Sequence, residues 1–326
     1  MLKKTATLFL AISLVLALLL PTACAGPPVS TADPVKLVPA NANILAYANV
    51  GAILADELLP RAYALLPKDE SDPQTWEAML AMFAQQIGLE LERFRELWFF
   101  GDTADMAKRS GYFGVIVKGN YTEPQLLDPI GQAIGTHLTP IDYRGRTIYT
   151  FGEQTWGVSM LSPDTFVAGG MAPIMDVISI MDGRAAAVSG RVLDLYNGLG
   201  GGLFKLSAYL PEGLRASVKE QLDKTVPYLP INLPAIAEMD TAGIVVALNG
   251  EQVLFDSKFC FTNEKSAQDI ELLVKSASAL MNWMGLTDKM QEFGKIVEKI
   301  KVERSGSCVD VSLDVPRSEI EKLLSG

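Results

Sequence analysis

The chain has 326 residues, of which 49% are hydrophobic, 8% aromatic and 20% charged, with 28 basic and 38 acidic side chains. This composition is too apolar for a disordered chain and too charged for a polytopic membrane protein. With 3 cysteines and 27 glycines, the chain is neither a disulfide-rich scaffold nor collagen-like.

The first 23 residues are predicted to be a sorting signal. Lys3 and Lys4 precede an apolar run from Leu8 to Leu20. As a helix this run rises only about 20 Å, short of the roughly 30 Å of a hydrocarbon core, so a secretory signal fits better than a membrane-spanning helix.

The end of this segment resembles a bacterial lipoprotein signal, in which the thiol of a Cys directly after a small residue receives a lipid. The resemblance implies lipidation of Cys24, which follows Ala23. The body is then extracytoplasmic, and the lipid on Cys24 anchors it to the cell membrane or envelope. Pro21 stands where these signals usually carry Leu, so cleavage after Ala25 and an uncleaved anchor stay open as alternatives.

Residues 24–38 are predicted to be a tether, because they are rich in Pro and small residues and show no periodicity. Removal of residues 1–23 takes away two lysines and no acid, which leaves 26 basic and 38 acidic side chains and a net charge of −12. Such a body repels a polyanion, so no nucleic-acid partner is expected.

A first α+β unit is predicted over residues 39–200. The pattern indicates a strand over 44–50, a helix over 51–66 and, after a capping box at 71–74, a helix with an apolar stripe over 76–87. The acidic and basic residues from Glu90 to Glu96 are predicted to form the solvated face of a helix. The remaining elements of this unit are a strand at 111–119, a helix capped by Thr122 and Gln125, three short strands, and a helix over 172–182.

The glycine-rich segment 197–202 is predicted to join this unit to a second one over residues 201–326. The second unit contains a strand at 203–210, a hairpin turned by Asn249-Gly250, helices over 263–284 and 288–300, a strand pair, and a short terminal helix. The turns at 143–146 and 304–307 are interpreted as equivalent. The predicted fold is therefore α+β, with antiparallel sheets, helices packed on one face, and two loosely duplicated units.

Cys260 and Cys308 both fall on the polar side of strands that alternate in polarity. Buried free cysteines more often join the apolar side. In an oxidising compartment a disulfide between them explains this placement, and two unpaired thiols are the alternative.

Three segments show a family resemblance: VPANANILAYANV at 38–50, GYFGVIVKGNYTEPQLL at 111–127, and the closing hairpin. Together they resemble a family of uncharacterised bacterial and archaeal surface lipoproteins that carry a domain of unknown function. The resemblance implies no catalytic residue for this chain.

Catalytic motifs are missing from the sequence. His137 is the one histidine, and neither a G-x-S-x-G nucleophile motif nor a zinc motif occurs. Asp310 and Asp314 share a strand face, but their spacing of about 13 Å exceeds that of glycosidase acid pairs. The sequence therefore predicts no catalytic residue, no cofactor and no metal.

The resulting expectation is a non-enzymatic binding or interaction module that is held at the membrane by its N-terminal lipid and binds an unknown protein. One alternative is a carrier of a small apolar ligand, in which the stripes at 76–87 and 270–284 line a cavity. The other is a carboxylate-dependent hydrolase that acts on cell-surface polymer.

Overall fold

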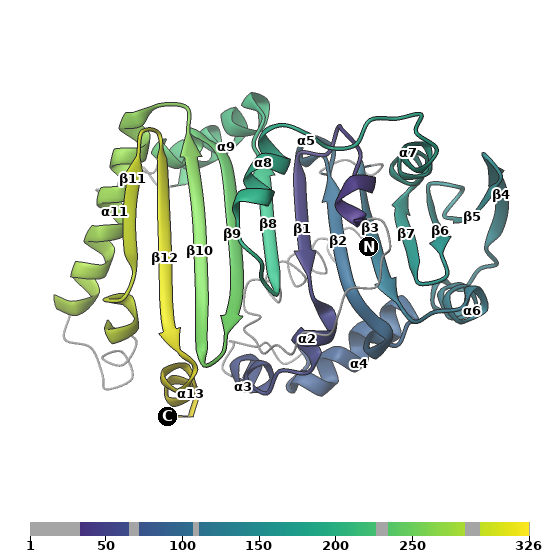
Figure 1. The fold of residues 1–326 in the computed structure, drawn as a ribbon, viewed down its shortest axis with the longest axis horizontal. Helices are drawn as coiled ribbons and strands as arrows, with labels where there is room; N and C mark the ends of the chain where they lie inside the picture. Colours follow the sequence, from purple (N-terminus) through teal and green to yellow (C-terminus); the bar gives the residue numbers. More distant parts are fainter. Residues whose placement is uncertain (1–32, 65–71, 107–110, 226–233, 284–293, 326) are drawn as a thin grey trace.

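The computed structural model describes residues 33–64, 72–106, 111–225, 234–283 and 294–325. Its centre is one antiparallel sheet of 12 strands in the order β11-β12-β10-β9-β8-β1-β2-β3-β7-β6-β5-β4 (Figure 1). The α+β class is thus confirmed, with a single sheet in place of the separate sheets that the sequence suggested. No helix of the described residues has the length and apolarity needed to cross a membrane.

The strands are β1 (Ile44–Ala48), β2 (Phe94–Gly101), β3 (Phe113–Gly119), β4 (Thr139–Tyr143), β5 (Arg146–Phe151), β6 (Trp156–Ser162), β7 (Thr165–Gly170), β8 (Phe204–Tyr209), β9 (Met239–Asn249), β10 (Gln252–Phe261), β11 (Lys301–Ser305) and β12 (Cys308–Pro316). The helices are α2 (Val50–Leu54), α3 (Leu58–Ala64), α4 (Trp76–Ile87), α5 (Thr103–Met106), α6 (Glu123–Ile134), α7 (Met171–Met181), α8 (Arg191–Gly198), α9 (Glu212–Thr225), α10 (Pro234–Ala237), α11 (Glu264–Trp283) and α13 (Arg317–Ser325). Two 3₁₀ helices, η1 (Pro34–Leu37) and η2 (Leu91–Arg93), complete the described elements.

Helices cover both faces of the sheet, which differs from the predicted single layer. Successive strand residues point to opposite faces. Leu45 and Phe100 lie on the face that we call face A, where they pack with η1, α7 and α8. Ala46 and Val117 lie on the opposite face, face B, where the apolar sides of α2, α4 and α6 cover them. Farther along face B, α10 and α11 cover β10 and β12.

The strand order repeats outward from the central pair of β1 and β8. On one side come the hairpin β2–β3 and then β7 and β6. On the other side come the hairpin β9–β10 and then β12 and β11. Helices α6 and α11 follow the first hairpin of each half, and α7 and α13 follow the second. This order matches the predicted duplication, with β4 and β5 as an extra hairpin at one edge.

The turns at 143–146 and 304–307, which were predicted to be equivalent, do not occupy matching positions in the two halves. The turn at Gly306 joins β11 to β12, and β12 pairs with β10. In the other half β7 pairs with β3, so the matching turn is the one between β6 and β7. The turn at 143–146 joins the extra strands β4 and β5.

The predicted helix over 51–66 is wrong in its continuity, since the structure has α2 and α3 with a break at Asp56. The carboxylate of Asp56 accepts a hydrogen bond from the Leu58 N–H at 2.7 Å and so starts a new helix. The following helix also begins later than predicted. Thr75 caps α4 by accepting from the Ala78 N–H at 3.1 Å, while Ser71 of the predicted capping box lies outside the described residues.

The predicted charged helix at residues 90–96 is wrong as well. Only η2 is helical there, and β2 begins at Phe94 as an inner strand between β1 and β3. The aromatic residues of β2 include Trp98 and Phe100 on face A. Their burial in the sheet stabilises a strand by more free energy than the charged residues would gain in a helix. The local charge pattern concealed this strand.

Residues 34–38 correct the predicted extent of the tether. They form η1 and the residue after it, and Val35, Leu37 and Val38 are buried in the core of face A. The Val188 N–H donates to the Val38 carbonyl at 2.7 Å. The body therefore starts before residue 38, and residues 1–32, which include the predicted signal and Cys24, lie outside the described part of the chain.

Local signals elsewhere are confirmed. Thr122 and Gln125 form the predicted capping box of α6. The β9–β10 hairpin pairs Asn249 with Gln252 and has Gly250 at a positive φ of 60°. Gly202, in the predicted joint, allows close backbone packing, because a Cβ there would lie 2.5 Å from the Val246 carbonyl oxygen. Most of the predicted helix at 288–300 lies outside the described residues, and only residues 294–297 are helical.

Candidate functional site

At one end of the sheet, over β10, β11 and β12, no hydrophobic cluster of the described residues covers face A. In the half that ends at β4, α7 packs its buried residues Ile174, Val177 and Ile178 on apolar strand residues. In the other half, the hydrophobic clusters of the described residues include no side chain from face A of β10, β11 or β12. Helix α13, which follows β12 as α7 follows β7, contacts α3 and leaves this face open (Figure 1). We call the uncovered part the open face.

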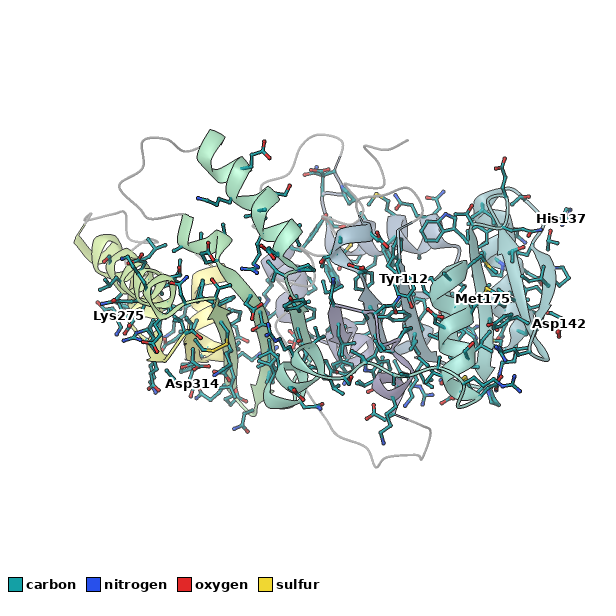
Figure 2. All side chains as sticks on the ribbon, turned by 90° about the horizontal axis from the view of Figure 1, so that it is seen from above. Tyr112, His137, Asp142, Met175, Lys275 and Asp314 are labelled. Carbon is teal, nitrogen blue, oxygen red and sulfur yellow. A yellow bond between two sulfur atoms is a disulfide. The ribbon has the colours of Figure 1, made fainter. Side chains whose placement is uncertain are left out.

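Most side chains of the open face are polar, as on a solvated side of an antiparallel sheet, and Leu254 of β10 is an apolar exception. Strand pairing sets Asp256 opposite Ser312, Lys258 opposite Asp310, and Cys260 opposite Cys308. On the outer strand, Lys301 and Glu303 extend the same rows. Figure 2 shows Asp314, the last acid of this group on β12, near the edge of the molecule.

The Cys260–Cys308 disulfide is present and lies on the open face. Its two cysteines face each other across β10 and β12, with a Cα–Cα distance of 4.0 Å. The neighbouring Phe261 N–H donates to the Ser307 carbonyl at 2.9 Å. The disulfide therefore joins strands that hydrogen bonds already hold in register.

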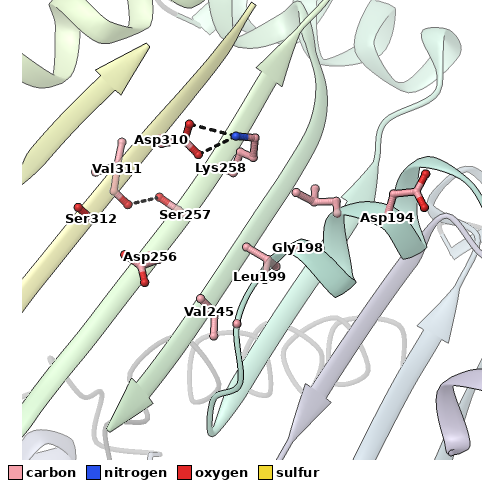
Figure 3. Close-up of a pocket in the computed structure, with 12 residues that line it drawn as sticks. Asp194, Gly198, Leu199, Val245, Asp256, Ser257, Lys258, Asp310, Val311 and Ser312 are labelled. Carbon is pink, nitrogen blue, oxygen red and sulfur yellow. Dashed lines mark hydrogen bonds and ion pairs between the residues drawn. The ribbon is translucent and has the colours of Figure 1, made fainter. Parts of the chain in front are cut away.

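A half-open trough of about 450 Å³ lies where the open face meets α8. Residues 194–195 and 198–200 form one wall, residues 256–258 of β10 and 310–312 of β12 form the other, and Val245 of β9 lies between them (Figure 3). The side chain of Leu195 overhangs β9 at Gly243, where a Cβ would lie 3.0 Å from Leu195. Close packing of α8 on β9 thus builds the wall.

Some charged groups of the trough form an ion pair with each other, and others do not. The Lys258 ammonium donates to both carboxylate oxygens of Asp310, at 2.9 and 3.0 Å. Asp256, on the same strand, is exposed, and its carboxylate makes no hydrogen bond or ion pair within the described residues. In Figure 3 the carboxylate of Asp194 points away from the trough.

The C-terminal end of α8 at Gly198, which has no basic residue in its last turn, also borders the trough. The lining is therefore net negative, since the Lys258–Asp310 pair is neutral and a helix C-terminus carries partial negative charge.

A second cation lies beyond the trough, beneath α8. Lys205 pairs across the strands with Val245, and its ammonium lies 4.0 Å from the centroid of the Tyr196 ring. Burial lowers the pKa of Lys205 and raises the pKa of Tyr196 to about 12. Lys205 is half-buried and is not part of the trough lining.

The structure does not bring together the described residues that were weighed for catalysis. They contain no group of three His, Cys, Asp or Glu side chains that could hold a metal. His137 is exposed, and Figure 2 places it at the opposite end of the molecule from Asp314. Asp310, one of the two acids weighed for hydrolysis, is occupied by Lys258, and Asp314 lies four residues along the same strand.

The apolar stripes that were candidate cavity linings pack in the core instead. Trp76, Met79 and Leu80 join the cluster around Phe204 and Val246. Ile270, Leu273 and Val274 pack against Phe261 and Val309. The described parts of both stripes thus contribute to filled clusters on face B.

Sequence reasoning placed the residues of the open face on one side of each strand but did not bring them together. It missed α8, although Val192, Leu195 and Tyr196 recur at helical spacing after Gly190. Recognition of α8 would have indicated a covering helix before β8. Nothing local indicates that this helix borders β10 and β12.

No protein-family model matches the chain, and no curated protein matches it. Three solved structures of TP0453 are similar in outline. Crystal form I has 12% identity and a TM-score of 0.45 over 91% of this chain and 98% of that one. Crystal form III has 10% identity and a TM-score of 0.47 over 90% and 98%, and crystal form IV has 11% and 0.46 over 90% and 96%. Values this low carry no conclusion about the site or the function of this chain.

Proposed function

We propose that this protein is an extracytoplasmic, lipid-anchored, non-enzymatic binding protein that holds a partner on its open face. The observation that carries the proposal is the uncovered part of face A over β10, β11 and β12, beside a covered half of the same sheet. The trough beside α8 gives this face a concave site of about 450 Å³. The disulfide fits an oxidising compartment.

The other functional readings gain no comparable support. A carrier needs an enclosed apolar cavity, whereas the trough is half open and has charged walls. A hydrolase needs two available acids at catalytic separation, whereas Lys258 engages Asp310. Membership in the family of uncharacterised surface lipoproteins belongs to the same proposal, and it rests on the N-terminal segment and the three resembling segments.

Anchoring is tested by metabolic labelling with an alkyne fatty acid in a bacterial host that processes lipoproteins. We expect the protein to incorporate the label and to fractionate with membranes, because the lipid is attached to the Cys24 thiol. The Cys24→Ser variant should lose the label and leave the membrane fraction. The matched control Cys260→Ser/Cys308→Ser should keep the label, since those cysteines form the disulfide. Equal labelling of Cys24→Ser and the wild-type protein would rule out this anchor.

Partner binding is tested by site-specific photocross-linking in cells. A photoreactive phenylalanine replaces Ser312 in the trough, and in the control it replaces Asp128, an exposed residue of α6 on face B. We expect a discrete adduct from position 312 and none of the same mass from position 128. Identical adducts from both positions, or none from 312, would contradict binding on the open face.

A further inference from the structure

We infer that the trough takes an organic cation on an aliphatic stem, namely a lysine or arginine side chain presented by a partner protein. The inference rests on the proposed function and specifies the chemistry of the partner. It is carried by the joint geometry of the trough: a negative wall, an apolar floor, and a neighbouring cation that is already neutralised.

The charges on the wall favour a cation. Asp256 projects from β10 as an exposed carboxylate without an ion pair in the described part of the chain, and the end of α8 adds the partial negative charge of its last carbonyl groups. Ser312, directly across from Asp256, offers a hydroxyl oxygen as a further acceptor. An ammonium or guanidinium group would donate to these oxygens as charge-assisted hydrogen bonds.

The floor favours a stem of methylene groups. Val245 is 4% exposed, and Leu195 and Leu199 line the trough from the α8 side. Lysine and arginine side chains place a charged head beyond an apolar stem, so one side chain satisfies both parts of the lining. The volume of about 450 Å³ leaves room for backbone atoms on either side of that side chain.

Other ligand classes fit less well. Within the trough lining an anion would need a free cation, but the Lys258 ammonium is held by both oxygens of Asp310 at 2.9 and 3.0 Å, and Lys301 of the open face is not part of that lining. A purely apolar ligand would cover Asp256 without giving its carboxylate a partner, which is costly. A metal ion lacks ligands, because the described residues contain no group of three His, Cys, Asp or Glu side chains that could hold one.

The test is isothermal titration of the full chain with the peptide acetyl-Leu-Arg-Leu-amide and with its citrulline counterpart, which has the same shape but no charge. We expect the arginine peptide to bind at least about tenfold more tightly, since its guanidinium donates charge-assisted hydrogen bonds that the uncharged citrulline cannot make. Asp256→Asn should remove about this factor. Asp314→Asn, on the same face but outside the trough, should change the affinity by less than about twofold, because exposed charges beyond contact distance are screened by salt.

Equal binding of the arginine and citrulline peptides, or an Asp256→Asn variant that binds like the wild-type protein, would overturn the cation assignment. Binding of n-hexylamine without binding of the arginine peptide would overturn the partner-protein source and leave a free amine as the ligand. Cross-linking at position 312 separates the two proposals. An adduct from position 312 in a protein that binds neither peptide would refute the cation and leave the open face as a docking surface.

Discussion

Replacement of Arg317 by Met is expected to lower the free energy of unfolding by about 3–5 kcal/mol, the range measured when one partner of a buried ion pair is removed. The Arg317 Nη1 atom lies 3.2 Å from Asp56 Oδ2, and the two side chains are 12% and 0% exposed. The variant would leave the Asp56 carboxylate charged in the interior without this guanidinium. This contact joins α13, at the end of the chain, to the start of α3.

Urea denaturation followed by circular dichroism measures this effect, and two further variants identify its cause. Arg95→Met removes a shorter ion pair, 2.9 Å to Asp164, whose side chains are 49% and 32% exposed, so its loss should stay below about 1 kcal/mol. Adding Asp56→Asn to Arg317→Met should recover stability, because Asn keeps the oxygen that accepts the Leu58 N–H and lacks the charge. Equal losses for Arg317→Met and Arg95→Met would contradict a buried pair.

Local patterns in the sequence predicted local structure well. The capping box at Thr122, the hairpin at Gly250 and the long helix α11 depend on residues within a few positions of one another, and all three are present. The polar placement of Cys260 and Cys308 also indicated their disulfide, since two cysteines on polar strand faces need a reason to be there. Only the choice between a disulfide and free thiols required the structure.

Long-range arrangement was beyond these patterns. The two halves of the sheet are joined at its centre by pairing of β1 with β8, whose paired residues Ile44 and Ala208 lie far apart in the chain. The charges from Glu90 to Arg95 recur at helical spacing, while neighbours on both sides make β2 an inner strand. The trough brings residues near 195 together with residues near 257 and 311. Sequence periodicity reports only on neighbouring residues, so it could not predict this arrangement.

The two halves of the sheet differ on face A because the helix after the second hairpin takes a different course in each half. A helix after the second hairpin has two options: it can return over face A, as α7 does, or continue past the end of the sheet, as α13 does. Helix α7 has a buried apolar side, with Val177 and Ile178 fully covered. Helix α13 begins with Arg317, whose ion pair with Asp56 draws it toward α3. The second half therefore keeps a polar strand surface where the first half has core.

Removal of the disulfide is expected to cost about 4 kcal/mol of unfolding free energy in the chain-entropy model, given the sequence separation of 48 residues between Cys260 and Cys308. The effect arises mainly in the unfolded chain, which gains freedom when the loop is opened. The native ladder between β10 and β12 should persist, because its hydrogen bonds do not depend on the disulfide. Guanidinium denaturation of Cys260→Ala/Cys308→Ala in a Cys24→Ser background, with Cys24→Ser alone as reference, measures the loss.

Reductant provides the matching control in the same experiment. The Cys24→Ser protein has only the two paired cysteines, so a phosphine reductant should move its unfolding curve onto that of the variant without cysteines. The unfolding curve of the variant without cysteines should not change when the reductant is added. Titration of the unreduced, unfolded Cys24→Ser protein should find no free thiol. Two free thiols in that titration, or an unfolding curve that reductant leaves in place, would show that the disulfide does not stabilise the protein. The open face would then depend on the strand ladder and the packing of α11 on face B alone.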